Sequence, residues 1–280
     1  MSDTLTIKEL LHQTTSSLKE AGTGSELDAQ ILIGAAMGQP REFLYAWPDT
    51  QVSDQAQREL EANLERRLRG EPLAYITGWR DFWTFELAVT PDVLVPRPET
   101  EQLVSLSLEH VDEVEPSIVV DVGTGSGAIA LAIGSERRSA HVIGIDTSEA
   151  CIEVARANAV RLDIDNVELR EGYLLETLDI QANVIVSNPP YVANDDPALL
   201  SDGVRFEPPL ALYGGDDGLD IIRELVTTAP QHLAPQGWLL LEHGMEQGEA
   251  VRDIMNEAFS GVRTVQDLSG LDRVTMGTLA

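Results

Sequence analysis

The amino-terminal part of the chain carries apolar side chains at helical spacing. Ser25 and Ser53 stand where N-caps would begin two helices, and Gly70 stops the last one. The apolar positions that define three helical faces are Ile7, Leu10, Leu11 and Leu18, then those within Leu27–Met37, then Leu60, Leu64 and Leu68. This pattern predicts a small helical bundle.

The hydrophobic period changes after this bundle. Between Trp79 and Phe85 aromatic and polar residues alternate, which is typical of a β-hairpin. From Ser117 onward apolar runs alternate with helical segments. The predicted strands are Ile118–Val122, Val142–Ile145, Val167–Leu169, Val184–Ser187, Trp238–Glu242 and a terminal pair near Val262–Val265 and Val274–Leu279. The alternation predicts an α/β fold with a doubly wound, mostly parallel sheet that ends in an antiparallel pair.

These patterns divide the chain into three regions. We predict a helical domain over residues 1–72, a β-hairpin linker over residues 73–95 and an α/β domain over residues 96–280. No internal repeat is apparent. A chain of 280 residues is long enough for one α/β domain and a smaller appendage.

Composition narrows the cellular setting and the chemistry. No apolar stretch approaches membrane-spanning length and the amino terminus lacks a basic signal sequence, so we expect a cytoplasmic protein with no membrane partner. Cys151 is the only cysteine, which excludes an intrachain disulfide and a thiolate metal cluster. The five histidines lack metal-ligand spacing, and we predict no metal site. Only His243, at the end of a predicted strand, stands near the expected ligand edge.

The net charge of the chain indicates which classes of substrate it can bind. Forty-seven acidic and 19 basic residues give a formal charge of -28, and a field of that sign repels phosphate backbones. Nucleic acid is therefore a poor substrate candidate. Lys8 and Lys19 are the only lysines, and acidity with scarce lysine suggests adaptation of this acidic protein to a salty cytoplasm.

The most informative segment is the end of the strand Val184–Ser187. It stops at Asn188, Pro189, Pro190 and Tyr191, and the prolines cannot continue a hydrogen-bond ladder. Asn188 is therefore left at the carboxyl end of a parallel strand, where α/β sheets bind ligands. Rigid carbonyl acceptors, an amide oxygen and an aromatic ring suit a flat group with two N–H donors.

A glycine-rich turn follows the strand Ile118–Val122. Its spacing is GxGxG over Gly123 to Gly127, rather than the GxGxxG of a dinucleotide site. The next strand ends at Asp146, whose carboxylate can accept both hydroxyls of a ribose. The alternative interpretation of Asp146 is a helix-entry residue, with Thr147 or Ser148 as the cap.

The glycine turn, the ribose acid and Asn-Pro-Pro-Tyr in this order resemble class I methyltransferases that use S-adenosyl-L-methionine. The whole chain is similar to the release-factor glutamine methyltransferase family (PrmC, also called HemK). Besides the two site segments, the likeness covers residues 70–78, 95–101, 204–208 and 241–244. Asn-Pro-Pro-Tyr also occurs in adenine-N6 DNA methyltransferases and in ribosomal-protein enzymes. The PRPETE segment, the RFEPPLAL segment and the helical domain separate this chain from both.

The resemblance implies an activity and its ligands. It implies a class I seven-stranded fold and transfer of a methyl group from S-adenosyl-L-methionine to the side-chain amide nitrogen (N5) of a glutamine. That glutamine belongs to the Gly-Gly-Gln motif of peptide-chain release factors, the proteins of translation termination. The helical domain would dock this protein substrate, and we expect a monomeric enzyme.

The resemblance also implies site residues. The residues expected to hold the donor are Gly123, Thr124, Gly125, Ser126 and Gly127 around its methionine part, Asp146 at its ribose, Tyr173 at its adenine and the backbone of Asn188. Residues Asn188 to Tyr191 would hold the glutamine. One departure is Glu171-Gly172-Tyr173, where family members often have an acid directly before the aromatic residue.

The proposed chemistry explains these residue types. An amide nitrogen is a poor nucleophile, so the Asn188 oxygen and the Pro189 carbonyl would hold the NH2 group and favour its pyramidalisation, with Tyr191 against the amide plane. These three are the predicted catalytic residues, and no catalytic histidine is expected. The alternatives are an adenine-N6 nucleic-acid methyltransferase, a ribosomal-protein glutamine methyltransferase and a donor-binding regulator without activity.

Overall fold

The computed structural model describes residues 5–201 and 203–280 and separates into two compact units. The smaller unit contains the chain up to Gly78 and the segment Leu200–Phe206. The larger unit contains Trp79–Leu199 and Glu207–Ala280. Each unit has its own hydrophobic core and is described by itself.

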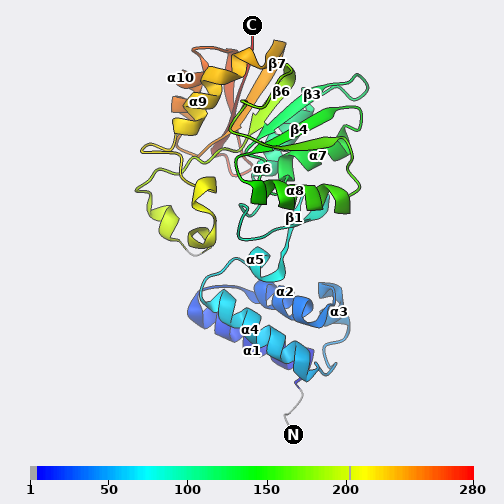
Figure 1. The fold of residues 1–280 in the computed structure, drawn as a ribbon. Helices are drawn as coiled ribbons and strands as arrows, with labels where there is room; N and C mark the ends of the chain where they lie inside the picture. Colours follow the sequence, from blue (N-terminus) through cyan, green and yellow to red (C-terminus); the bar gives the residue numbers. More distant parts are fainter. Residues whose placement is uncertain (1–4, 202) are drawn as a thin grey trace. The chain divides into compact units, whose positions relative to one another are not determined.

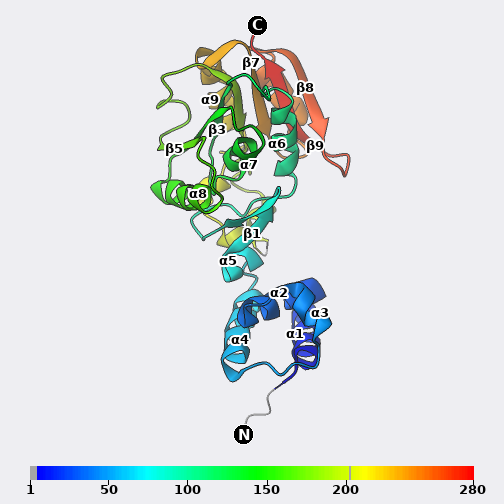
Figure 2. The same ribbon diagram turned by 90° about the vertical axis from the view of Figure 1, so that its right-hand side faces the viewer.

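The smaller unit is a helical bundle (Figure 2). Its helices are α1 (Ile7–Ala21), α2 (Glu26–Met37), α3 (Arg41–Ala46), α4 (Asp54–Leu68), α5 (Leu73–Thr77) and the 3-10 turn η2 (Val204–Phe206). Ser25 and Ser53 precede α2 and α4 as predicted, and the Ser53 hydroxyl accepts a hydrogen bond from the Ala56 amide at 3.3 Å. Buried Ile7, Leu18, Leu32, Ile33 and Leu60 form its core. The predicted bundle is confirmed.

Residues 79–88 form an antiparallel hairpin, and it belongs to the larger unit. Strands β1 (Trp79–Phe82) and β2 (Phe85–Ala88) pair antiparallel around a two-residue turn. The alternation of aromatic and polar residues places Phe82 and Leu87 in the core of that unit.

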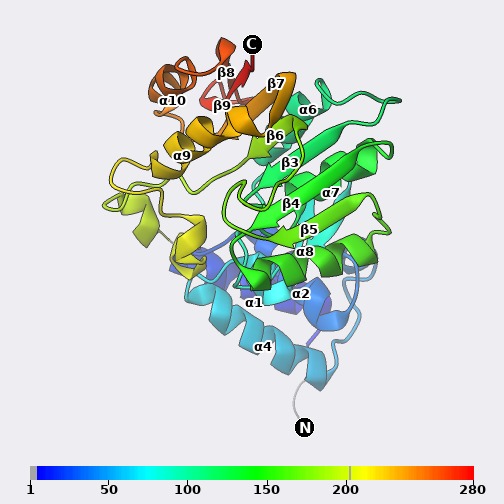
Figure 3. The same cartoon turned by 45° about the horizontal axis from the view of Figure 1, so that its top comes forward.

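A seven-stranded sheet forms the centre of the larger unit, in the order β5-β4-β3-β6-β7-β9-β8 (Figure 3). The strands are β3 (Ile118–Val122), β4 (His141–Asp146), β5 (Val167–Glu171), β6 (Ala182–Ser187), β7 (Leu233–Glu242), β8 (Ser260–Gln266) and β9 (Asp272–Thr278). The first five in the spatial order are parallel, and β9 pairs antiparallel with both β7 and β8. Each of the seven predicted strands is present, although β7 begins at Leu233, before the predicted start at Trp238.

Helices cover both faces of this sheet (Figure 1). One face packs against α6 (Thr100–Leu108), α7 (Ala128–Glu136) and α8 (Glu149–Arg161), and the other against α9 (Asp220–Thr228) and α10 (Gly248–Met255). The short 3-10 segments are η1 (Pro197–Leu200), η3 (Pro209–Ala211) and η4 (Ala229–Gln231). With both faces covered, the central strands are apolar throughout, and Val184, Ile185 and Val186 are fully buried.

The register of the central strands sets the position of the site. Val122 of β3 pairs with Ser187 of β6, and Ser187 pairs with Leu241 of β7. The residues that follow these three positions therefore emerge side by side at one edge of the sheet. They are Gly123, Asn188 and Glu242.

Candidate active site

A cavity of about 380 Å³ lies at the carboxyl ends of the parallel strands. It brings together seven of the predicted site residues: Gly123, Gly125, Asp146, Tyr173, Asn188, Pro189 and Pro190. Its remaining wall includes residues that the sequence did not single out as site residues, among them Asp92, Leu94, Cys151, Leu210 and Tyr213. A space of this size is at the lower end of ordinary small-molecule sites.

The glycine turn and Asp146 form one hydrogen-bonded unit. The Gly125 amide donates to Asp146 Oδ2 at 2.9 Å, and the Ser148 amide donates to Asp146 Oδ1 at 3.0 Å. Gly125 has φ 55°, in the left-handed region that favours glycine, and open space lies where a Cβ would stand. Each carboxylate oxygen keeps a further lone pair for a ligand hydroxyl. The helix-entry role and a ligand-binding role of Asp146 are therefore compatible.

Other residues of the turn point away from the cavity. Thr124 and Ser126 are buried, and neither they nor Gly127 belong to the cavity wall. The Thr124 hydroxyl donates to Asp121 Oδ2 at 2.7 Å, and the Ala130 amide donates to the same oxygen at 3.1 Å. The side chain of Thr124 thus hydrogen-bonds the glycine turn to strand β3.

Asp121 is a buried acid that the predicted site residues do not include. Burial raises the pKa of its carboxyl to about 7, although the hydrogen bonds from Thr124 and Ala130 favour the charged form. Its other oxygen, Oδ1, has no hydrogen-bond partner among the described residues. An acid within the otherwise apolar strand β3 is the sequence signal that could have identified it.

The departure at Gly172 has a steric explanation. A Cβ at this position would lie 2.5 Å from Thr177 Cγ2, so an acidic side chain there requires Thr177 to move. Glu171 is exposed, pairs in regular register with Asp146 and does not line the cavity. Tyr173 does line it, with its hydroxyl donating to Glu224 Oε2 at 2.7 Å. At the end of β5 the cavity wall therefore offers an aromatic ring without the neighbouring acid.

Asn188 is oriented by a residue from another element. Its Nδ2 donates to the Thr100 hydroxyl oxygen at 3.1 Å, and no described residue donates to its Oδ1. Pro189 and Pro190 continue the cavity wall beside it. The site thus presents an amide oxygen next to a rigid proline segment.

Tyr191 lies beside the cavity rather than on its wall, near the buried acid Glu242. Burial raises the pKa of Tyr191 to about 12, and the Glu242 charge adds to this shift. Glu242 is 1% exposed, and burial raises the pKa of its carboxyl to about 7. Hydrogen bonds from the hydroxyls of Thr100 and Tyr191 and the positive charge of Arg273 oppose this shift. Both residues form a polar layer behind Asn188.

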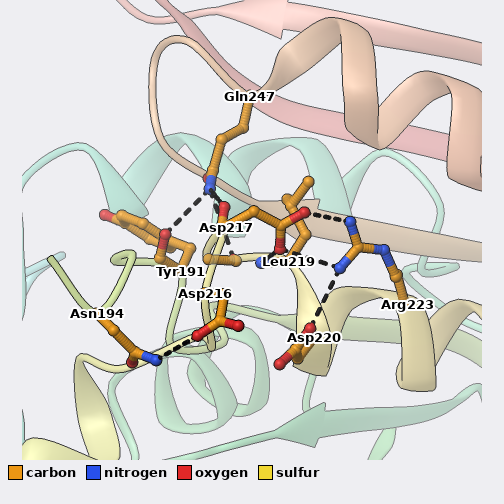
Figure 4. A network of polar contacts seen from close by, with 9 residues as sticks. Tyr191, Asn194, Asp216, Asp217, Leu219, Asp220, Arg223 and Gln247 are labelled. Atoms are coloured by element: carbon orange, nitrogen blue, oxygen red, sulfur yellow. Dashed lines mark hydrogen bonds and ion pairs between the residues drawn. The ribbon is translucent and has the colours of Figure 1, made fainter. Parts of the chain in front are cut away.

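Gln247 anchors the main chain that follows the prolines (Figure 4). Its Nε2 donates to the Tyr191 carbonyl at 3.0 Å, with the carbonyls of Asp217 and Gly218 at 3.4 and 3.5 Å. Its Oε1 accepts from the Gly244 amide at 2.8 Å. One side chain therefore joins the Asn-Pro-Pro-Tyr segment, the glycine-rich loop before α9 and the turn after β7.

An ion pair joins two further segments of the wall. Arg97 Nη2 lies 2.6 Å from Glu207 Oε2, and the Glu207 side chain is 1% exposed. Burial raises the pKa of Glu207, and the Arg97 charge opposes that shift. Next to this pair, Leu94 and Pro208 line the cavity. The pair thus joins the PRPETE and RFEPP segments.

The remaining candidates have structural contacts. His243 is fully buried, and its ring nitrogens bond to the Gly244 carbonyl at 2.9 Å and to the Thr275 hydroxyl at 2.8 Å. Within residues 5–201 and 203–280, no cluster of three or more acidic, histidine or cysteine side chains could hold a metal ion. In the same ranges no helix combines the length and the apolar character needed to cross a bilayer.

Comparison with known proteins gives consistent results over the whole chain. Residues 9–78 match the model of the PrmC N-terminal domain, and residues 115–259 match that of a methyltransferase domain. The release factor glutamine methyltransferase of Aliivibrio fischeri is 43% identical over 98% of this chain and 97% of its own length. That of Pseudomonas aeruginosa is 45% identical over 91% and 93% of the two chains.

A solved structure supports the fold alone. The crystal structure of a methyltransferase from Pyrococcus furiosus superposes with a TM-score of 0.53 at 18% identity, covering 81% of this chain and 98% of that one.

Proposed function

Because the chain belongs to the release factor glutamine methyltransferase family, we propose that it methylates the N5 nitrogen of the glutamine in the Gly-Gly-Gln motif of peptide-chain release factors. It is an enzyme that uses S-adenosylmethionine as the methyl donor. The observation that carries the assignment of the site is the Asn188 oxygen, which has no hydrogen-bond partner among the described residues and adjoins the glycine turn in one cavity.

The residues of the cavity suit the donor. The backbone turn at Gly123 and Gly125 leaves room for close approach of its methionine part, and Asp146 has acceptor capacity for its ribose hydroxyls. Tyr173 would stack on the adenine. When bound, S-adenosylmethionine supplies an electrophilic methyl group on a sulfonium centre.

The chain's own residues then act on the glutamine. The Asn188 oxygen and the Pro189 carbonyl would accept hydrogen bonds from the substrate NH2 group and position its nitrogen for attack on the donor's methyl group. Such bonds favour a pyramidal nitrogen whose lone pair is withdrawn from amide resonance. Transfer of the methyl group leaves a positively charged amide that still carries both N–H protons, and this cation is acidic enough to lose one of them to water, so no general base is required.

The described residues of the helical unit contribute no side chain to the cavity wall, and we assign this unit to docking of the protein substrate. The charge of -28 argues against a nucleic-acid substrate, as duplex binding would have to overcome repulsion from phosphates. We further propose that the enzyme acts as a monomer in the cytoplasm.

Mass spectrometry of a purified release factor tests this function. After incubation with the protein and donor, one added methyl group should map to the Gly-Gly-Gln glutamine. A release factor with that glutamine replaced by alanine is the control and should stay unmodified. Methylation of a ribosomal protein or of DNA, with the release factor untouched, would contradict the proposal.

The docking role has its own measurement. An intact release factor should be methylated with a much higher kcat/KM than a short Gly-Gly-Gln peptide, because the helical unit adds binding energy remote from the reaction. Equal kcat/KM values for both substrates would remove that role.

A further inference from the structure

We propose that Thr100 is a positioning residue for methyl transfer, because its hydroxyl holds the Asn188 amide with Oδ1 directed to the substrate. The inference rests on the proposed function and names a residue outside the cavity wall. Thr100 is the first residue of α6, in the PRPETE segment, 88 residues before Asn188 in the chain.

The contact is well defined. Asn188 Nδ2 lies 3.1 Å from Thr100 Oγ1, and Thr100 is only 3% exposed, so water does not compete easily for the hydroxyl. The Thr100 amide donates to the Arg97 carbonyl at 3.1 Å. Pro96 and Pro98 flank Arg97 and restrict the backbone of this turn. The start of the helix therefore holds the hydroxyl in place.

A third residue, Glu242, determines which of Thr100 and Asn188 donates in their hydrogen bond. A threonine hydroxyl can give or accept a hydrogen bond, so alone it would not distinguish the two ends of the Asn188 amide. Glu242 lies behind it, 1% exposed, and hydrogen bonding from the Thr100 hydroxyl favours its carboxylate. In its charged form Glu242 only accepts, so the hydroxyl proton is then directed to Glu242 and the hydroxyl oxygen is left to accept from Asn188 Nδ2.

The sheet register creates this arrangement. Ser187 and Leu241 are paired across β6 and β7, so Asn188 and Glu242 follow as neighbours at the same edge. Helix α6 packs on this part of the sheet through buried Leu103 and Val104. Thr100 is thereby placed against both residues.

The arrangement bears on substrate choice. With Nδ2 held by Thr100, Asn188 offers an acceptor to the cavity, which matches the N–H donors of a glutamine amide. The flipped amide would present its own N–H donors to the substrate NH2 group, and the two would repel. Thr100 thus excludes the unproductive orientation of Asn188.

Three variants test the proposal. Thr100→Val removes the hydroxyl and keeps the shape, whereas Thr100→Ser keeps the hydroxyl. Ser107→Ala is the matched control, because it deletes another buried hydroxyl of α6 that bonds only to the Leu103 carbonyl at 2.7 Å. For each, kcat and KM on an intact release factor, the dissociation constant for S-adenosylmethionine and the thermal midpoint are measured.

We expect Thr100→Val to lower kcat by about 10- to 100-fold, which is less than the loss of about 10² to 10³ for one deleted transition-state hydrogen bond, because Asn188 itself remains. Its donor dissociation constant should change by less than about twofold, and Thr100→Ser and Ser107→Ala should keep kcat within about threefold. If Thr100→Val does not fold, Thr100→Ala replaces it in the same assays.

Wild-type kcat retained in a folded variant without the hydroxyl would overturn the positioning role, as would equal losses in Thr100→Val and Ser107→Ala. The proposed function fails separately, when the wild-type protein leaves the release-factor glutamine unmethylated.

Discussion

Replacing Glu242 by glutamine should stabilise the protein at alkaline pH and have a smaller effect at acidic pH. Glu242 is 1% exposed, and burial raises the pKa of its carboxyl to about 7 in the folded protein from an ordinary value of 4.5. A folded-state pKa above the unfolded one means that the native state binds the proton more tightly. The stability from this proton is complete below about pH 4.5 and is lost as pH rises through about 7.

The magnitude follows from the size of the shift. A difference of about 2.5 units corresponds to about 3 kcal/mol of unfolding free energy, and about 2 kcal/mol of it falls between pH 5.5 and pH 8. Glutamine has the shape of the neutral acid and does not titrate. The unfolding free energy of Glu242→Gln minus that of the wild type should therefore grow by about 2 kcal/mol over this interval.

Denaturant unfolding at constant ionic strength measures this difference. Glu257→Gln is the matched control, since Glu257 is exposed in the same unit and its replacement removes the same charge. The second buried acid, Asp121, titrates in all three proteins and cancels in the comparison. A difference that stays constant or shrinks from pH 5.5 to pH 8 would refute the burial of a titrating carboxyl at Glu242.

Asn188→Ala should reduce kcat by about 10² to 10³ with donor affinity nearly unchanged, and turnover within about threefold of wild type would contradict the amide clamp. Asp146→Ala should weaken donor binding by about 1.5 to 3 kcal/mol in calorimetry, while an unchanged dissociation constant would leave Asp146 only its bonds to Gly125 and Ser148. Gln247→Leu should cost about 1 to 3 kcal/mol in denaturant unfolding, because the Gly244 amide and the Tyr191 carbonyl lose their partner; equal stability would show that water replaces it. The thermal midpoint should rise from low salt to about 0.1 M as screening weakens the repulsion among acidic side chains, and a flat or falling midpoint would show that this repulsion is negligible.

The elements of the fold were predictable because their signals are local. Burial on one face of an element gives the helical spacing before Gly70 and the alternation in the hairpin. Burial on both faces gives the short apolar runs after Ser117. The glycine turn and the strand end at Asn188 are local as well, since backbone conformation is restricted by glycine and proline themselves. Their convergence on one cavity follows from the parallel sheet.

Which side chains surround Asn188 was decided by the tertiary structure alone. Thr100 of α6 contacts Asn188, Glu242 of β7 contacts Thr100, and only the strand register and the packing of α6 bring the three together. A sequence does not state such a register, because it depends on contacts between residues far apart in the chain. The same holds for Thr124, whose polar side chain suits a ligand site but turns inward to the buried carboxylate of Asp121. A buried carboxyl such as that of Asp121 needs a hydrogen-bond partner, and which residue supplies it depends on the packing of the folded core.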